Sequence, residues 1–424
     1  MDERIYREYV AILKEELQPA MGCTEPIAVA YCAALARKTL GALPETVEVL
    51  ASANIIKNVK SVIVPNTNGQ RGIAAAAAAG IIADNADAQL QVLACLTPEQ
   101  TDAVGAYLQQ AAFTVRRADK DYVFDIQVRV TAGADSASVE IAGYHTNVIH
   151  IEKNGIVQFH KDYQESGSQH TTDRSLLTVE NIIAFANEVD IADVQETLQR
   201  QIDYNWAIAE EGLRGDYGAN IGRILLQSYG MSIHNRAKAY AAAGSDARMN
   251  GCDLPVVINS GSGNQGLTAS LPVIVYAREL GVTQQMLYRA LVVSNLVTIH
   301  LKTGIGSLSA YCGATSAGAG AGAGICYLYG GRYDEIAHTV VNALAINSGM
   351  LCDGAKASCA AKIASAVEAG LLGMQMQMHE SQFYGGDGIV VKGVENTIRN
   401  IGTLASEGMR ETDRTIIRMM IQEH

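Results

Sequence analysis

Charged and aromatic residues are both scarce in this 424-residue sequence. Charged side chains make up 18% of the chain, below the roughly 25% that is typical of globular proteins, and aromatic residues make up 6%. Lys and Arg number 32 against 44 Asp and Glu, so the net charge is −12, and no extended run of basic residues interrupts this acidic balance. Because nucleic acids and anionic membranes bind basic surfaces, we expect neither of them as a partner.

Apolar runs are missing where a leader or a membrane span would need them. The first ten residues, MDERIYREYV, are charged from the second position onward, unlike the apolar region of a secretory signal. Residues 303–331 carry no charge, but nine of these 29 residues are Gly, which exposes too much polar backbone for a lone membrane helix. We therefore expect a cytoplasmic protein that buries this stretch in its own interior.

Small residues are abundant where bulky ones are missing. The chain contains 40 Gly and only 7 Pro, and 48% of its residues are hydrophobic. This composition predicts a globular enzyme with a large, closely packed interior, and the length suggests about two to three folding units. In residues 313–324, GATSAGAGAGAG, the apolar segment that follows favours a buried helix over a flexible linker.

The spacing of apolar residues changes along the chain. It predicts a helix over residues 2–19, a second helix that Thr24 caps, and mostly helices from residue 171 onward. Between them, strand-like segments alternate with helices near residues 70–83 and 98–112. The strand-like segments are TVEVLAS (46–52), LQVLACL (90–96), FDIQVRVTA (124–132), ASVEIAG (137–143) and TNVIHIE (146–152).

These elements predict an α+β fold in three segments. We expect N-terminal helices at residues 1–44 that pack on the main domain, and a smaller α+β lobe of mixed or antiparallel strands at residues 45–165. Within this lobe, residues 122–160 have the pattern of a meander of short antiparallel strands. Residues 166–424 are expected to form a large, mainly helical catalytic domain.

The eight cysteines fall into groups by their sequence surroundings. Cys32, Cys95 and Cys326 have apolar neighbours on regular elements, so we expect them to be buried core thiols. Cys252 has a turn-like setting that leaves its role open. The remaining four lie beside residues that break regular structure, at expected loops or helix starts: Cys23, Cys312, Cys352 and Cys359.

The spacing of these four thiols does not decide their role. Cys312 and Cys352 are 40 positions apart, and Cys359 follows 7 positions later, unlike the close pairs of zinc ribbons or ferredoxins. On spacing alone, inert thiols are the main interpretation and metal or cluster ligation is the alternative. Cys23 is expected just outside a helix N-terminus, where the helix dipole favours a thiolate.

Two polar motifs of the expected α+β lobe are candidates for substrate binding. Asn66 and Thr67 follow a strand-like run, a place where amide and hydroxyl groups can face a carboxylate. His145, in GYHTN, is expected to orient substrate or donate a proton. A structural role for this histidine is the competing interpretation.

A third candidate is the Gly-rich segment SGSGNQG at residues 260–266. Its successive N–H groups can form a concave site for an anion, and its polar side chains are Ser260, Ser262 and Asn264 among others. Segments of this composition are about as often simple turns, so the motif supports substrate binding only together with other evidence.

Five motifs together resemble the L-cysteine desulfidase family. That family is related to the iron–sulfur-dependent L-serine dehydratases, whose alpha-chain-like catalytic domain it shares. The resemblance covers essentially the whole chain, and the five motifs are far more specific together than singly. They are MGCTEPIAVA (21–30), NVKSVIVPNTNGQRG (58–72), INSGSGNQG (258–266), YCGATSAGAGAG (311–322) and NSGMLCDGAKASCAAK (347–362).

The resemblance implies a [4Fe–4S] cluster held by Cys312, Cys352 and Cys359, with the fourth iron open to substrate. It implies β-elimination of L-cysteine to pyruvate, ammonia and hydrogen sulfide, with the cluster as Lewis acid. Cys23 matches a family position that is either the catalytic base or a resting-state ligand of the open iron. Glu25 is a competing base, although an acidic residue in the first turn of a helix more often complements the helix dipole.

Other interpretations remain open at this level. An iron–sulfur L-serine dehydratase is the nearest alternative, and a non-enzymatic zinc-binding protein is a more distant one. A pyridoxal-phosphate enzyme would use residues 260–266 as its phosphate loop, but no lysine motif supports it. We expect a small amino-acid substrate and leave homo-oligomerisation open. Four further site candidates are not ranked: Lys57, Asn58, His300 and Lys302.

Overall fold

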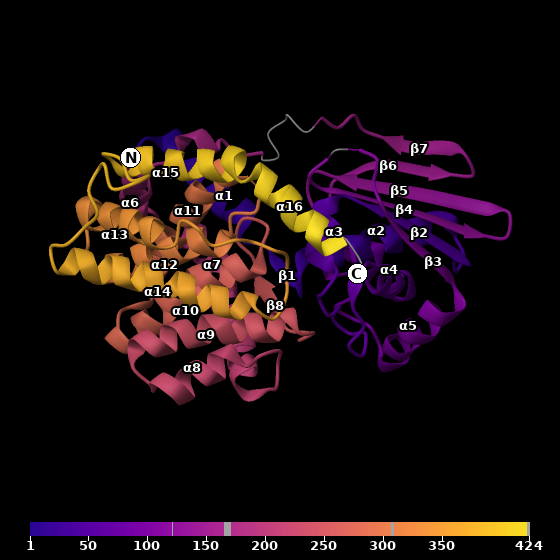
Figure 1. Cartoon of the computed structure of the whole chain (residues 1–424), viewed down its shortest axis with the longest axis horizontal. Helices are drawn as coiled ribbons and strands as arrows, with labels where there is room; N and C mark the ends of the chain where they lie inside the picture. The colour runs from indigo at the N-terminus through magenta and orange to yellow at the C-terminus, as the bar shows by residue number, and fades with distance from the viewer. Residues whose placement is uncertain (121, 165–170, 307–308, 422–424) are drawn as a thin grey trace.

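The computed structural model describes residues 1–120, 122–164, 171–306 and 309–421. Its α+β fold class is the one predicted, and Figure 1 shows two lobes, one mainly helical and one built on a sheet. Within the described residues, none of the helices combines the length and the apolar character that a membrane span requires.

The first helix, α1 (Glu3–Glu16), belongs to the helical lobe. Asp2 caps it by accepting hydrogen bonds from the N–H groups of Arg4 and Ile5. Its apolar face buries Tyr9 against the ring of Phe185 in α6 (Val179–Glu188), with the ring centroids 5.4 Å apart. The first helix therefore packs with segments more than 160 residues away along the chain.

The rest of the helical lobe is a set of closely packed helices around α12 (Gly313–Leu328). The predicted buried helix at residues 313–324 is confirmed, since all of its residues from Ala314 to Gly324 are buried. The other helices of this lobe are α7 (Ile191–Arg214), α8 (Ile221–Tyr229), α9 (Ile233–Met249), α10 (Gly263–Leu280), α11 (Gln284–Ile305), α13 (Tyr333–Ile346), α14 (Cys359–Met378), α15 (Val394–Thr403) and α16 (Arg410–Ile421).

Glycine allows α12 and α14 to touch through their backbones. A Cβ atom added at Gly318 would lie 2.2 Å from the carbonyl oxygen of Ala366, and one added at Gly370 would lie 2.1 Å from that of Gly318. No side chain fits between these helices, so their separation is set by the main chain. The glycines of residues 313–324 thus allow the close approach of α12 and α14.

The α+β lobe contains a six-stranded mixed sheet in the order β3-β2-β4-β5-β6-β7. Only the pair β2 (Thr46–Ala51) and β3 (Ala112–Arg117) is parallel. The remaining strands are β4 (Asp125–Ala132), β5 (Asp135–Ala142), β6 (Val148–Lys153) and β7 (Ile156–His160). They pair antiparallel in chain order, which confirms the predicted meander.

Helix α2 (Thr24–Leu40) packs on this sheet and not on the helical lobe. Its buried residues share a core with β2, β4, β5 and α4 (Gly72–Ala83), and a Cβ added at Gly80 would lie 1.9 Å from the carbonyl oxygen of Ala30. The two shorter neighbours are α3 (Ala53–Val59) and α5 (Pro98–Gln110). The two helices of residues 1–44 therefore lie in different cores, α1 in the helical lobe and α2 in the α+β lobe.

Three local predictions were wrong. The 3-10 helix Ala86–Gln91 and the turns after it take the place of the strand expected at residues 90–96. The backbone N–H groups there bond locally, from Val92 to the Gln89 oxygen at 3.0 Å and from Ala94 to the Gln91 oxygen at 2.9 Å. Cys95 in this segment is exposed and not a core thiol. Cys23, not Thr24, is the N-cap residue of α2, and the Thr24 hydroxyl donates to the carbonyl oxygen of Gly261 at 3.0 Å.

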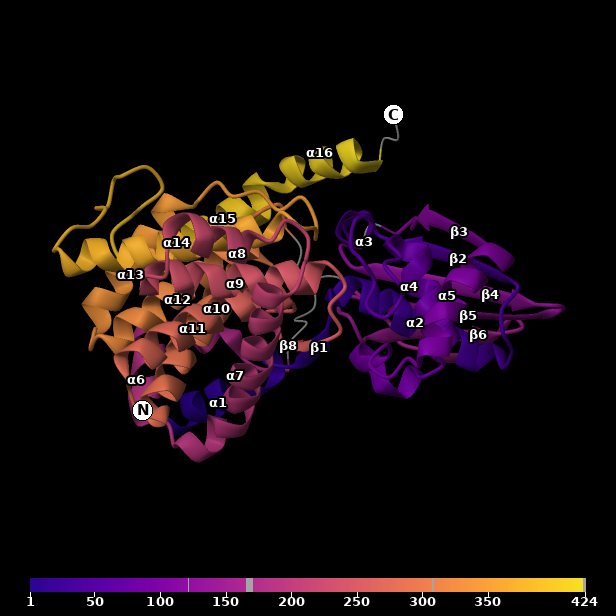
Figure 2. The same ribbon diagram turned by 90° about the horizontal axis from the view of Figure 1, so that it is seen from below.

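A strand pair and the last helix of the chain both join the lobes. Strand β1 (Pro19–Met21) pairs antiparallel with β8 (Pro255–Val257), next to the start of α2. In addition, α16 leaves the helical lobe and reaches α3 of the α+β lobe, as Figures 1 and 2 show from two directions. The carbonyl oxygen of Met420 accepts a hydrogen bond from Lys60 at 2.7 Å.

Candidate active site

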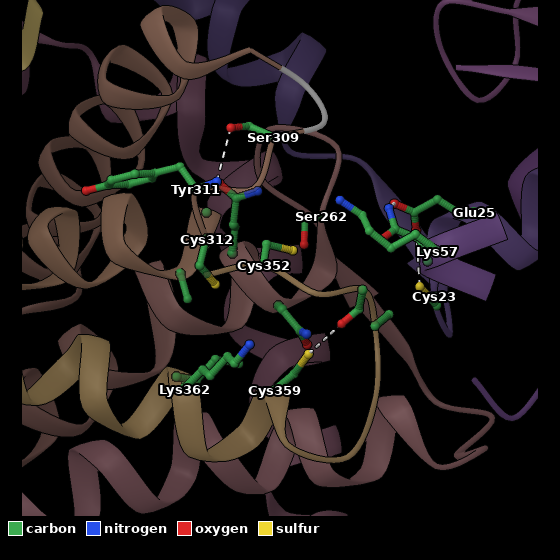
Figure 3. A pocket seen from close by; sticks show the side chains of 18 of the residues that line it. Cys23, Glu25, Lys57, Ser262, Ser309, Tyr311, Cys312, Cys352, Cys359 and Lys362 are labelled. Carbon is green, nitrogen blue, oxygen red and sulfur yellow. Dashed lines mark hydrogen bonds between the residues drawn. The ribbon is translucent and has the colours of Figure 1, made fainter. Parts of the chain in front are cut away.

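Four of the eight cysteines line one pocket between the lobes, which we call the cysteine pocket. Cys312 and Cys359 lie at the starts of α12 and α14, Cys352 lies in the loop before α14, and Cys23 lies at the start of α2. Figure 3 shows the first three on the helical side of the pocket and Cys23 with Glu25 across from them. The pocket therefore needs both lobes to be complete.

A short backbone bridge brings Cys312 and Cys352 together. Tyr311 pairs antiparallel with Leu351, the Cys312 N–H donates to the Met350 oxygen at 3.1 Å, and the Cys352 N–H donates to the Ala310 oxygen at 2.6 Å. Thiols that are 40 positions apart in the sequence thus become neighbours.

Gly354 brings the loop between Cys352 and Cys359 into contact with the α+β lobe. Its φ is +92°, and a Cβ atom there would lie 2.3 Å from the carbonyl oxygen of Lys57, so only glycine fits this close approach. The carbonyl oxygen of Gly354 accepts from Cys359 Sγ at 3.7 Å. This loop therefore ties Cys359 to the junction of the lobes.

Positive charge surrounds the three thiols on the helical side. Lys57, Lys302 and Lys362 line the cysteine pocket. A hydrogen bond from Cys312 lowers the pKa of Cys352 to about 5, and Lys57 also lowers it. The same hydrogen bond and burial raise the pKa of Cys312 well above its usual value. This environment stabilises one thiolate, shared mainly between two sulfur atoms.

Cys23 and Glu25 form a hydrogen-bonded pair on the opposite side. Cys23 Sγ donates to Glu25 Oε2 at 3.1 Å, and Asn58 Nδ2 donates to Glu25 Oε1 at 3.2 Å. Burial and the Glu25 charge raise the pKa of Cys23, which opposes the effect expected from the helix dipole. Burial also raises the pKa of Glu25, but His145 and the bond from Cys23 outweigh it and lower the pKa overall.

A second cavity adjoins the cysteine pocket. The two cavities share Glu25, Ser262, Gln265 and Lys302 in their linings, and the second cavity also contains His145 and Ser260. His145 is half-buried and packs edge-on to Phe124 with a centroid distance of 4.9 Å. Burial lowers the pKa of this histidine, and its Nε2 has no hydrogen-bond partner among the described residues.

The structure brings most of the predicted site residues together. Two line neither cavity: Asn66 donates to the Leu93 oxygen at 2.9 Å, and Thr67 donates to the Val64 oxygen at 2.7 Å. His300 also lies outside both cavities and bonds Glu395 at 2.7 Å. The predicted residues that line the cysteine pocket are Cys23, Ser262, Asn264, Cys312, Cys352 and Cys359, together with the unranked Lys57, Asn58 and Lys302.

Comparison with known proteins places this site in a family. A family model described as "Serine dehydratase alpha chain" matches residues 87–418. The chain belongs to the serine dehydratase alpha chain family. The matched range includes the three helical-side cysteines, whereas Cys23 and Glu25 precede it.

Three similar proteins are UPF0597 proteins of bacteria. The one from Desulfitobacterium hafniense is 58% identical over 421 residues, which cover 99% of this chain and 98% of the relative. The one from Lachnoclostridium phytofermentans is 49% identical, with coverage of 98% and 100%. The one from Treponema denticola is 45% identical, and both chains are covered completely.

Three thiols from separate segments line the cysteine pocket, a donor set of the type that an iron–sulfur cluster uses. Among the described residues, no three His, Cys, Asp or Glu side chains converge closely enough to hold one ion. A structural zinc ion needs four such donors around one point. A cluster binds each cysteine through a different iron atom, so it suits three thiols that line one pocket from separate segments.

Five pocket residues with polar or charged side chains were not named as site candidates from the sequence: Arg248, Gln265, Ser309, Tyr311 and Lys362. Arg248 had a usable signal, since it is a charged residue near the end of the Ala-rich helix α9, and it is only 2% exposed. Gln265, Tyr311 and Lys362 lie within motifs that carry the family resemblance, but no pattern marked them as pocket residues, and Ser309 lies outside those motifs. Only the approach of α10, α12 and α14 brings them to the pocket.

Proposed function

We propose that this protein is a lyase that eliminates the β-thiol of L-cysteine and releases pyruvate, ammonia and hydrogen sulfide. The observation that supports it is the meeting of three cysteines from the helical lobe with the Cys23–Glu25 pair in one pocket. In the proposed reaction, the three thiols would hold the cofactor and the Cys23–Glu25 pair would accept a proton.

The proposed cofactor is a [4Fe–4S] cluster, and Cys312, Cys352 and Cys359 are the residues that would hold it. When bound through three cysteines, such a cluster supplies a Lewis acid for the departing thiol group. The surrounding lysines offset the negative charge that three thiolates bring into a buried pocket.

The Cys23–Glu25 pair is the proposed proton acceptor. The pair shares one proton between Sγ and Oε2 at 3.1 Å, and Asn58 holds the other carboxylate oxygen. Removal of the proton at Cα and loss of sulfide from Cβ leave aminoacrylate, which takes up water and releases ammonia to give pyruvate. Cys23 is buried and Glu25 is half-buried, so this proton transfer is largely shielded from bulk water.

L-Serine is the second candidate substrate, and membership of the serine dehydratase alpha chain family favours it. Elimination of its β-hydroxyl group would use the same residues and yield pyruvate and ammonia without sulfide. The two candidates therefore differ in one measurable product.

The test is turnover by protein reconstituted with iron and sulfide without air. We expect pyruvate and stoichiometric sulfide from L-cysteine; pyruvate from L-serine with negligible sulfide from L-cysteine would favour the second candidate. Cys352→Ala should lose iron and activity, whereas Cys95→Ser, at an exposed position outside the pocket, should retain both. Full activity of Cys352→Ala would contradict the cluster.

A further inference from the structure

The cysteine pocket contains a buried arginine that lacks an anionic partner. Arg248 is 2% exposed and lines the pocket. Within the described part of the chain, its one hydrogen bond runs from Nη1 to Met249 Sδ at 4.0 Å, and its Nε has no partner. The Arg248 charge also lowers the pKa of Glu25, but no carboxylate of the described residues forms an ion pair with the guanidinium. A buried guanidinium without a directly paired anion is costly, so the arrangement indicates that an anionic ligand completes the pairing.

The other cations of the pocket already have protein partners. Lys57 pairs with Asp413, Lys362 pairs with Asp353, and Lys302 donates to the carbonyl oxygen of Gly306. Among the described residues of the pocket, Lys302 and Arg248 are thus the two cations without a carboxylate partner, and Arg248 is the one that also has a buried N–H group without an acceptor.

The start of α10 is shaped around this guanidinium. A Cβ atom added at Gly263 would lie 2.2 Å from Arg248 Nε and 2.7 Å from Cζ, so the absence of a side chain there makes room for the arginine. Helix α10 is 18 residues long and has no side-chain cap at Ser262. Its N-terminal N–H groups and dipole therefore add positive potential beside Arg248.

Two amide oxygens beside the arginine also lack donors. Asn264 Oδ1 and Gln265 Oε1 are buried without hydrogen-bond partners among the described residues. Both side chains line the cysteine pocket with Arg248. A cation with two free acceptors matches a ligand that carries both a carboxylate and an ammonium group.

We propose that Arg248 binds the α-carboxylate of the amino-acid substrate, and that Asn264 and Gln265 accept hydrogen bonds from its α-ammonium group. Guanidinium binds carboxylate through two parallel hydrogen bonds, which orients the ligand as well as holding it. This assignment rests on the proposed function, because it concerns the substrate of the same pocket.

The decisive measurement needs no variant. Calorimetry of the anaerobic, reduced protein without iron compares L-cysteine with L-cysteinamide, which has the same side chain but no carboxylate. We expect L-cysteine to bind at least tenfold more tightly, since hydrogen bonds to charged groups contribute strongly. Equal affinities would overturn the assignment.

Variants then locate the effect. Arg248→Met should weaken L-cysteine binding tenfold or more and change L-cysteinamide binding less than twofold, and Arg248→Lys should lie between Arg248→Met and the unmodified protein. The control is Arg278→Met, since Arg278 stacks 3.5 Å from the centre of the Trp206 ring and lines neither cavity. Unchanged L-cysteine binding by folded Arg248→Met and Arg248→Lys would contradict the proposal.

Turnover separates this assignment from the proposed function. If the reconstituted protein acts on neither L-cysteine nor L-serine but still binds carboxylates through Arg248, the proposed reaction is wrong and the carboxylate site is retained. If L-cysteine is turned over and Arg248→Met leaves KM unchanged, the proposed reaction is retained and the role of Arg248 is wrong.

Discussion

Lys57 of α3 and Asp413 of α16 form an ion pair across the two lobes, with Nζ 2.5 Å from Oδ1. The Lys57 side chain is 2% exposed, and it lines the cysteine pocket. Asp413 lies on the helix that leaves the helical lobe to reach α3, as Figure 2 shows. The last helix of the chain therefore supplies the counter-ion of a lysine in the candidate active site.

Asp413→Asn should destabilise the contact between the lobes. Loss of the carboxylate charge leaves the Lys57 ammonium buried without its counter-ion, and we expect a cost of about 2 kcal/mol in urea unfolding. Glu411→Gln is a matched control on the same helix, because Glu411 forms an exposed pair with Arg414. Exposed pairs contribute about 0–1 kcal/mol, so equal effects of the two substitutions would contradict the structural role of Asp413.

Glu25→Gln should lower turnover without preventing substrate binding. Removal of a positioned acid or base typically costs about 10²–10⁴-fold in rate, and we expect kcat to fall by this amount with KM changed less than threefold. Exchange of the Cα proton for solvent deuterium, followed by NMR, should be lost in parallel. Glu99→Gln, on the exposed first turn of α5, is the control. Exchange of the Cα proton at the normal rate in Glu25→Gln would show that a different residue removes this proton.

Gly322→Ala should force α12 and α14 apart. A Cβ atom at Gly322 would lie 2.6 Å from the carbonyl oxygen of Gly370, so the added methyl group has no room. Overpacking of this kind costs about 1–3 kcal/mol, and the displaced helix starts should also lower the iron content after reconstitution.

Gly105→Ala provides the opposite case within a helix of the α+β lobe. The nearest atom to its added Cβ is Gln70 Nε2 at 3.7 Å, an ordinary contact. We expect a gain of about 0.5–1 kcal/mol, because alanine favours the helix. If both glycine substitutions changed the melting temperature in the same direction, backbone contact would not explain the glycines of α12.

Asp246 should make stability depend on pH. Its carboxylate accepts from the Gly222 N–H at 3.0 Å in a buried setting, and burial raises the pKa of Asp246 to about 6. The unfolded chain releases this proton near pH 4, so the folded state holds an extra proton between about pH 4 and 6. The contribution of protonated Asp246 to the free energy of unfolding is therefore fully present below about pH 4 and is lost as the pH rises to about 6.

Asp246→Asn tests this directly, since the amide oxygen can still accept from Gly222. We expect the variant to lose this part of the pH dependence and to gain about 2 kcal/mol relative to the unmodified protein at pH 8. Urea unfolding at pH 5 and pH 8 measures both effects. An identical pH profile for the two proteins would show that Asp246 titrates normally.

Local sequence determined much of the architecture. The antiparallel meander, the buried Gly/Ala helix at residues 313–324 and the position of Cys312 at a helix start follow from periodicity and composition, because neighbouring residues decide these features. Even so, residues 90–96 have strand-like composition but lie in turns, where backbone hydrogen bonds are local and Val92 and Leu93 are buried.

Tertiary structure alone decided the composition of the pocket. The Tyr311–Leu351 bridge joins cysteines 40 positions apart, the backbone contact of α12 with α14 positions Cys359, and the junction of the lobes adds Cys23 and Glu25. The proposed role of Arg248 also depends on tertiary structure, because Gly263 makes room for its guanidinium and no carboxylate of the described residues pairs with it. The sequence determines which side chains can bind a metal, transfer a proton or bind an anion, whereas long-range packing decides which of them face one another.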